Sequence, residues 1–174
     1  MTDLFTTKLY NETKPYHTIV DKHPFVQLIR KNPQAAKLYI DFNKICIYTI
    51  QQTTNPFDKS LFSRLKRNIN HNDIDFNISP NFKTLLQRCQ QFPIEHSYMF
   101  YLGLMMGYKI LDKYVKDDIL SYNDSDIKLL IDDFKNFLNK TITSNNNQEQ
   151  FINTVSQSYL FINQIFDEYQ KQLI

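Results

Sequence analysis

The sequence predicts an all-α protein that forms a single domain over residues 1–174. Apolar residues recur with a helical period, as at Leu38, Phe42 and Ile45, and no segment alternates apolar and polar residues between hairpin-type turns. An asparagine or serine stands directly before a proline at three places. This arrangement is typical of helix starts, because the side chain caps free N–H groups and proline has none to satisfy. The three pairs are Asn32-Pro33, Asn55-Pro56 and Ser79-Pro80.

The expected helices follow one another with polar segments between them. The first is expected to begin at Thr13, because Pro15 then falls in the first turn, where proline costs no hydrogen bond. Asparagine-rich segments at 68–77 and 144–148 are expected to be loops. The later helices are expected over about 33–50, 56–69, 80–91, 93–117, 124–142 and 149–173.

Composition and charge exclude several classes of function. The net charge of +2 is too small to indicate a nucleic-acid or membrane-surface partner. No apolar run is long enough to span a membrane, and the first residues do not predict a secretory leader. Cys46 and Cys89 lie on expected helices without metal-type spacing. A soluble, cytoplasmic protein with two buried, reduced thiols is therefore expected.

The only two glycines, Gly103 and Gly107, fall in one apolar helical run. A spacing of four residues puts both on one face of the helix. Glycine within a helix costs about 1 kcal/mol relative to alanine, so a compensating close approach to the backbone is expected here. A second packed helix and a flat ligand both fit this pattern, and the glycines alone leave the two open.

His17 and Asp21 are separated by four residues, so on a helix the carboxylate can reach the imidazole. A carboxylate on one ring nitrogen fixes the tautomer and leaves the other nitrogen free to bind a metal. A structural histidine fits the same spacing.

Three segments, in the expected order, resemble the heme oxygenase family and together cover about a third of the chain. Residues 13–25 begin Thr-Lys-x-x-His and are similar to the family's proximal segment. Residues 95–109, Glu-His-Ser-Tyr-Met-Phe-Tyr-Leu-Gly-Leu-Met-Met-Gly-Tyr-Lys, are similar to its distal helix. Residues 158–170 are similar to its last helix.

This resemblance implies a heme-oxygenase-like fold with heme as the bound group. His17 would be the iron ligand, Asp21 its partner, and Gly103 and Gly107 would lie against the porphyrin. Tyr98 and Lys135 match two of the residues that hold the heme propionates, whereas Tyr10 and Ile131 replace two lysines. The implied reaction is oxygen-dependent cleavage of heme to biliverdin, carbon monoxide and ferrous iron, with a reductase or ferredoxin as electron donor.

The chain departs from the family where the reaction needs polar groups. Leu104 stands at the position of the distal aspartate, which holds the water that relays a proton. Phe100 and Ile162 stand at the distal arginine and asparagine, and Tyr108 replaces a glycine. A leucine cannot relay a proton, so a catalytically inactive binding scaffold is the alternative. A di-iron protein of related fold is not expected, because Glu-x-x-His spacing is absent from the sequence.

Overall fold

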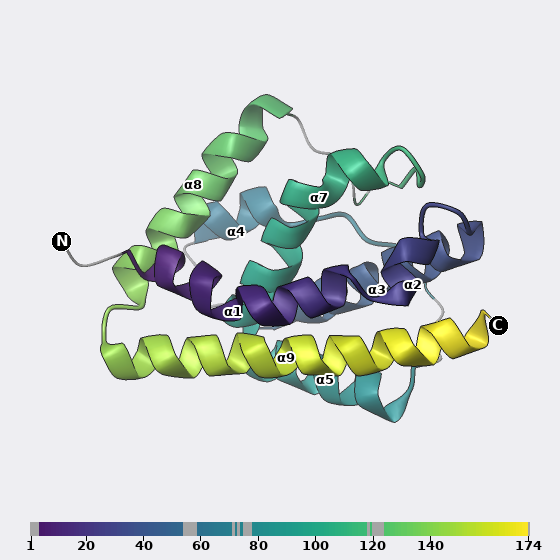
Figure 1. Cartoon of the computed structure of the whole chain (residues 1–174). Coiled ribbons are helices and arrows are strands. Elements are labelled where there is room, and N and C mark those ends of the chain that lie inside the picture. Colours follow the sequence, from purple (N-terminus) through teal and green to yellow (C-terminus); the bar gives the residue numbers. More distant parts are fainter. Residues whose placement is uncertain are drawn as a thin grey trace.

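The computed structural model describes residues 4–53, 59–70, 72, 74, 78–117, 119 and 124–173. All regular elements in these ranges are helical, which confirms the predicted all-α class (Figure 1). They are α1 (Phe5–Asp21), α2 (Pro24–Leu28), α3 (Pro33–Gln51), α4 (Lys59–Leu65), α5 (Pro80–Gln91), α6 (Pro93–Ser97), the π-helical turn η2 (Tyr98–Leu102), α7 (Gly103–Leu111), α8 (Asp124–Thr141) and α9 (Asn145–Gln172).

Two of the three predicted capped starts are confirmed. The Asn32 side-chain oxygen accepts hydrogen bonds from the backbone N–H groups of Gln34 at 2.9 Å and Ala35 at 3.3 Å. The Ser79 hydroxyl oxygen accepts one from the N–H of Phe82 at 3.2 Å. Each cap satisfies donors that the first helical turn cannot pair internally. The third predicted start, Asn55-Pro56, lies outside the described residues.

The prediction that the first helix begins at Thr13 is wrong, because α1 already begins at Phe5 and carries Pro15 in its interior. Thr13 is buried, and its hydroxyl donates a hydrogen bond to the Leu9 carbonyl oxygen at 2.7 Å. Phe5 and Leu9 extend the buried face of the helix by two turns, with exposed fractions of 3% and 0%. Their burial outweighs the single hydrogen bond that Pro15 cannot make.

The predicted loop at 144–148 is also wrong, since α9 begins within it at Asn145. Ser144 is the cap, and its hydroxyl oxygen accepts a hydrogen bond from the Asn147 N–H at 3.2 Å. The polar residues that suggested a loop form the solvent-exposed first turn of the helix.

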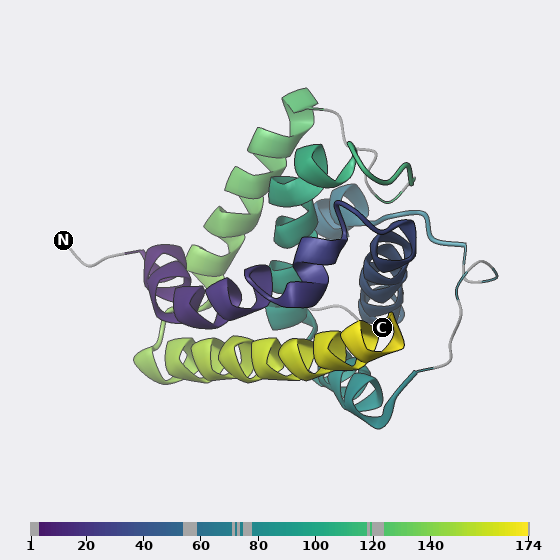
Figure 2. The same ribbon diagram turned by 45° about the vertical axis from the view of Figure 1, so that its right-hand side comes forward.

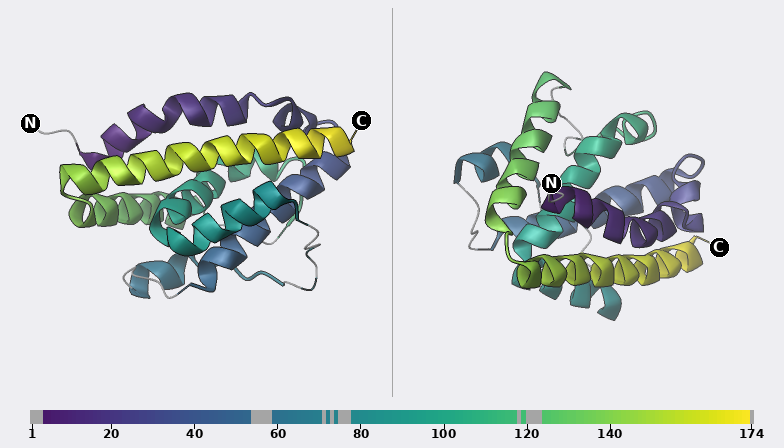
Figure 3. Two further views of the ribbon diagram at one scale, coloured as in Figure 1. Left: turned by 90° about the horizontal axis from the view of Figure 1, so that it is seen from below. Right: turned by 60° about the vertical axis from the view of Figure 1, so that its left-hand side comes forward.

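The long helix α9 is the spine of the fold. α1 packs along one side of it and α5 along the other, and α1 and α9 run in the same direction (Figures 1 and 3). α8 leans away from this layer, and α7 stands between α8 and α3 (Figure 2). Aromatic rings fill the centre, where Phe166 of α9 meets Phe25 of α2 at 5.0 Å and Phe42 of α3 at 5.3 Å between ring centroids.

A buried polar network joins α5, α6 and α9. The Nδ1–H of His96 donates to the Phe92 carbonyl oxygen at 2.7 Å, which leaves Nε2 as an acceptor. The Ser158 hydroxyl donates to that Nε2 at 2.8 Å and accepts from the Arg88 Nε–H at 2.9 Å. Burial, together with the positive charge of Arg88, lowers the pKa of His96 to about 4, against a smaller opposing effect of the hydrogen bond to Phe92.

This network predicts a loss of stability in mild acid. The folded-state pKa of His96 is depressed below its ordinary value of 6.5, so its contribution is complete above pH 6.5 and is lost as the pH falls towards 4. Between pH 7.5 and pH 5, His96 should lower the free energy of unfolding by about 2 kcal/mol. Urea denaturation at both pH values checks this. His96→Gln is the control, because it cannot titrate, and an equal pH dependence in both proteins would contradict the prediction.

Candidate functional site

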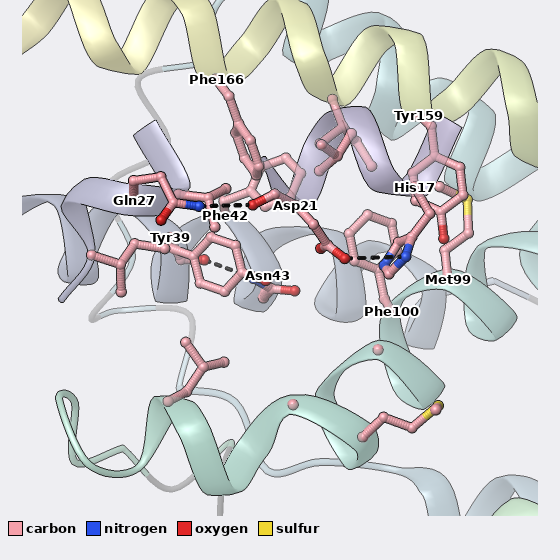
Figure 4. A pocket seen from close by; sticks show the side chains of 18 of the residues that line it. His17, Asp21, Gln27, Tyr39, Phe42, Asn43, Met99, Phe100, Tyr159 and Phe166 are labelled. Atoms are coloured by element: carbon pink, nitrogen blue, oxygen red, sulfur yellow. Dashed lines mark hydrogen bonds and ion pairs between the residues drawn. The ribbon is translucent and has the colours of Figure 1, made fainter. Parts of the chain in front are cut away.

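A cavity of about 460 Å³ lies between α1 and α2 on one side and α7 on the other, with α3 and α9 forming its inner wall (Figure 4). Apolar and aromatic side chains form most of the lining, and a few polar groups interrupt it. The lining residues are His17, Val20, Asp21, Val26, Gln27, Ile29, Arg30, Tyr39, Phe42, Asn43, Met99, Phe100, Gly103, Met106, Gly107, Leu111, Tyr114, Tyr159, Ile162 and Phe166.

His17 and Asp21, on the last turns of α1, both line this cavity. The His17 Nδ1 lies 3.3 Å from a carboxylate oxygen of Asp21, as the spacing predicted (Figure 4). An N–H at Nδ1 that points to the carboxylate places the lone pair on Nε2, the form of imidazole that binds metals. The ring is held edge-on against Tyr159 of α9 at 5.4 Å between centroids. The His17 side chain remains 47% exposed, so a ligand can reach it.

Gly103 and Gly107 of α7 line the opposite side of the cavity. A Cβ atom at either position would meet no heavy atom of a neighbouring element within 4 Å. The interpretation that a second helix packs against them is therefore wrong, since these glycines face open space. Neither has a positive φ, so the backbone conformation does not require glycine there. What the missing side chains provide is room in the cavity.

The chain enters α7 through a π-helical turn. The helix predicted over 93–117 is therefore helical from Pro93 without a gap, but it changes its winding at Tyr98–Leu102 and ends at Leu111 instead of 117. Such turns widen a helix by one residue and are frequent at functional sites. The Tyr101 hydroxyl anchors this turn by donating a hydrogen bond to the Gln51 side-chain oxygen of α3 at 2.8 Å. Met99 and Phe100, from the same turn, line the cavity.

Two of the three distal positions face the cavity. Phe100 and Ile162 line it and are only 4% exposed, so they present an apolar wall. Leu104 is 2% exposed within the hydrophobic core and is not part of the lining. The side chain of Tyr108 lies outside the described residues.

The expected propionate-binding residues are not part of the lining. Tyr98 packs against Phe151 of α9 at 6.3 Å between ring centroids, and burial raises the pKa of its hydroxyl. Lys135 is exposed on α8. Neither residue contributes to the cavity, and neither do Tyr10 or Ile131.

The cavity also contains polar residues that were not predicted from the sequence as site residues. Asn43 is 95% buried, and its side-chain N–H donates to the Tyr39 carbonyl oxygen at 2.8 Å. Burial, with the nearby negative charge of Asp21, raises the pKa of the Tyr39 phenol, so this group stays neutral. An asparagine on the apolar stripe of an expected helix was a usable signal for Asn43. Arg30, in the turn after α2, gave no such signal.

The donor set suits a single histidine ligand rather than a metal cluster. In the part of the chain that the structure describes, no three His, Cys, Asp or Glu side chains come together at metal-binding distance. A di-iron centre of several carboxylates and histidines is therefore not formed among these residues.

Comparison with solved structures places the fold. The chain superimposes on the crystal structure of heme oxygenase-1 from the cyanobacterium Synechocystis sp. PCC6803 in complex with heme, with a TM-score of 0.79 and 17% identity over 98% of this chain and 94% of that one. The chain has the heme-oxygenase fold. Heme oxygenase from Leptospira interrogans is also similar, with a TM-score of 0.72 and 16% identity over 95% of this chain and 100% of that one. No protein-family model and no curated protein matches the sequence.

Among the described residues, no helix has both the length and the apolar character needed to cross a membrane.

Both cysteines are buried, as predicted. Cys46 of α3 and Cys89 of α5 contact each other.

Proposed function

We propose that this protein binds heme in the cavity between α1 and α7, with Nε2 of His17 as the iron ligand. The observation that carries the proposal is that the α1 wall and the α7 wall of the cavity offer complementary features to a flat ligand. One wall presents an accessible imidazole oriented by Asp21, and the other presents Gly103 and Gly107 with open space in front of them. A flat molecule needs a ligand on one face and clearance on the other, and this cavity offers both. The solved relative with heme bound adds support through the shared fold.

The residues around the cavity fit a porphyrin in size and chemistry. Cavities of a few hundred cubic ångströms, mostly apolar with a few directed polar groups, are typical of cofactor sites. Phe42, Phe100 and Phe166 present aromatic edges to the cavity. They are already at most 4% exposed, so burial of the apolar surface of the macrocycle itself would provide most of the binding energy. Bound heme would supply an iron centre for oxygen chemistry and would itself be the substrate of an oxygenase reaction.

If the protein turns heme over, the products would be biliverdin, carbon monoxide and ferrous iron, and an external reductase or ferredoxin would supply electrons. The chain's own part in such a reaction is to position the ring and to move protons. Asp21 holds the His17 tautomer, and Asn43 offers a buried amide that can hydrogen-bond to water in the cavity. Phe100 and Ile162 exclude water from their side of the cavity.

The test of heme binding is an absorption titration with hemin. The wild-type protein should give a Soret band typical of an imidazole-ligated iron, and His17→Ala should lose or strongly change it, because no other described histidine lines the cavity. His23→Ala and His96→Ala are the controls, provided that circular dichroism shows them folded, since both side chains are buried in structural hydrogen bonds. An unchanged spectrum in His17→Ala would remove His17 as the ligand.

A binding scaffold without catalytic activity is the second candidate. The apolar character of Phe100 and Ile162 favours it, because both lie where an oxygenase of this fold is expected to hold polar groups. The hemin titration also separates the two candidates at their first step. A scaffold that does not bind heme gives no Soret band. A protein that binds heme gives one whether or not it cleaves the heme.

A further inference from the structure

We propose that Arg30 anchors a carboxylate of the ligand in the cavity, so that the carboxylate-bearing edge of the porphyrin faces the turn between α2 and α3. This inference rests on the proposed heme binding and specifies how the ligand is oriented. It assigns a binding role to a lining residue of the turn after α2, whereas the residues at which the resemblance places the propionates are not part of the lining.

The position of the positive charge carries the argument. Among the described residues, Arg30 is the only lysine or arginine that lines the cavity. It lies in the turn after α2, separated from the helix by Ile29, and its side chain is exposed. Within the described part of the chain, the Arg30 side chain makes no hydrogen bond, ion pair or cation–π contact. A guanidinium at the mouth of an apolar cavity without an internal partner is free to receive an anion from the ligand.

Neutral hydrogen-bond donors line the same cavity. Gln27, one turn before Arg30, places a side-chain amide in the lining, and one of its N–H groups donates to the Asp21 carbonyl oxygen at 3.3 Å. Tyr114 adds a phenol that is 45% exposed. A guanidinium forms two parallel hydrogen bonds with a carboxylate, and nearby amide and phenol donors can complete the site.

The competing cations are placed elsewhere. Lys135 is exposed on α8 outside the lining, and Lys14 extends its ammonium over the Tyr10 ring, 5.7 Å from the centroid. The two lysines that would complete the family's propionate site are Tyr10 and Ile131 in this chain. The cations that would bind the propionates near α8 are therefore missing from the cavity, whereas Arg30 provides one in the turn after α2.

The experiment compares hemin with its dimethyl ester, which keeps the ring and the iron but has no free carboxylates. Affinities are measured by Soret titration for the wild type, Arg30→Met, Lys31→Met and Lys135→Met. Lys31 is the matched control, an adjacent exposed cation outside the lining. Arg30→Met should weaken hemin binding about tenfold. It should leave binding of the ester unchanged, and Lys31→Met should change neither.

Four outcomes would overturn the proposal. Equal weakening of hemin binding and ester binding by Arg30→Met would mean that Arg30 acts through packing and not through a carboxylate. Lys135→Met instead of Arg30→Met could produce the ester-sensitive loss, which would return the carboxylates to α8. If the wild type binds hemin and Arg30→Met binds it with the same affinity, the role of Arg30 is refuted and the proposed heme binding is not. Absence of binding by the wild type would refute heme binding itself and the anchor with it.

Discussion

Gly103→Leu is expected to stabilise the unliganded protein and to abolish hemin binding. Gly103 has ordinary helical dihedrals, φ −57° and ψ −46°, and a Cβ there would meet no neighbouring heavy atom within 4 Å. Leucine is the better helix former by about 1 kcal/mol, so the melting temperature of the ligand-free protein should rise by about 2–4 °C. The new side chain occupies the cavity, so affinity for hemin should fall by about 100-fold or more.

Two measurements check this prediction, a thermal melt without ligand and a hemin titration. Gly103→Ala is the graded control, because it gains a similar helix propensity and adds only one methyl group to the cavity. It should bind hemin more tightly than Gly103→Leu. Loss of stability in Gly103→Leu would mean that a protein segment packs against this face. Unchanged hemin affinity would place the ligand away from α7.

These glycines also mark the limit of what the sequence could predict. Their spacing correctly placed them on one helix face, because 3.6 residues per turn fixes that relation locally. What lies opposite that face depends on how α7 packs in the tertiary structure, which the spacing does not contain. Whether a second helix packs against the glycines could therefore be decided only after the structure placed α7 beside a cavity.

The helix starts that local signals fix were predicted correctly, whereas the start that depends on tertiary contacts was not. Asn32 and Ser79 were predicted correctly because a cap and the proline after it are local signals. The start at Thr13 was wrong because a local proline rule competed with burial of Phe5 and Leu9, and burial depends on partners such as Phe151, far along the chain. Propensity is a weak prior wherever tertiary contacts oppose it.

The candidate site was partly predictable for a related reason. His17 and Asp21 interact across one helical turn, so their spacing was sufficient to predict the pair. Arg30 lies in a turn, where no periodicity indicates the direction of a side chain. Leu104 follows Gly103 directly in the sequence, yet it points into the core, because neighbouring helical residues project about 100° apart.

Wild-type protein supplied with heme, a reductase system and oxygen is expected to form biliverdin very slowly. Positioned acid–base groups typically contribute about 10²–10⁴-fold in rate, and the distal wall of this cavity is built from Phe100 and Ile162, which have no proton to give. Asn43 can hold a water by hydrogen bonds but does not titrate. Absorbance of biliverdin over time, compared with a heme oxygenase that retains the distal aspartate, measures the deficit.

A proton-donating side chain introduced at a residue of the cavity lining tests whether missing proton delivery causes the slow formation of biliverdin. Leu104→Asp is a poor choice, because it would bury a carboxylate in the core, where the charged form is strongly disfavoured. Ile162→Asp places the acid in the cavity wall, where partial desolvation should raise its pKa towards the working pH. It should form biliverdin faster than the wild type and faster than Ile162→Asn, a control of nearly the same shape that cannot give up a proton. Equal rates in the two variants would show that proton delivery is not what limits the reaction. Rapid biliverdin formation by the wild type would show that another group already relays the proton. Water held at Asn43 and Tyr39 is the candidate that the cavity offers, and Asn43→Leu should then stop the reaction.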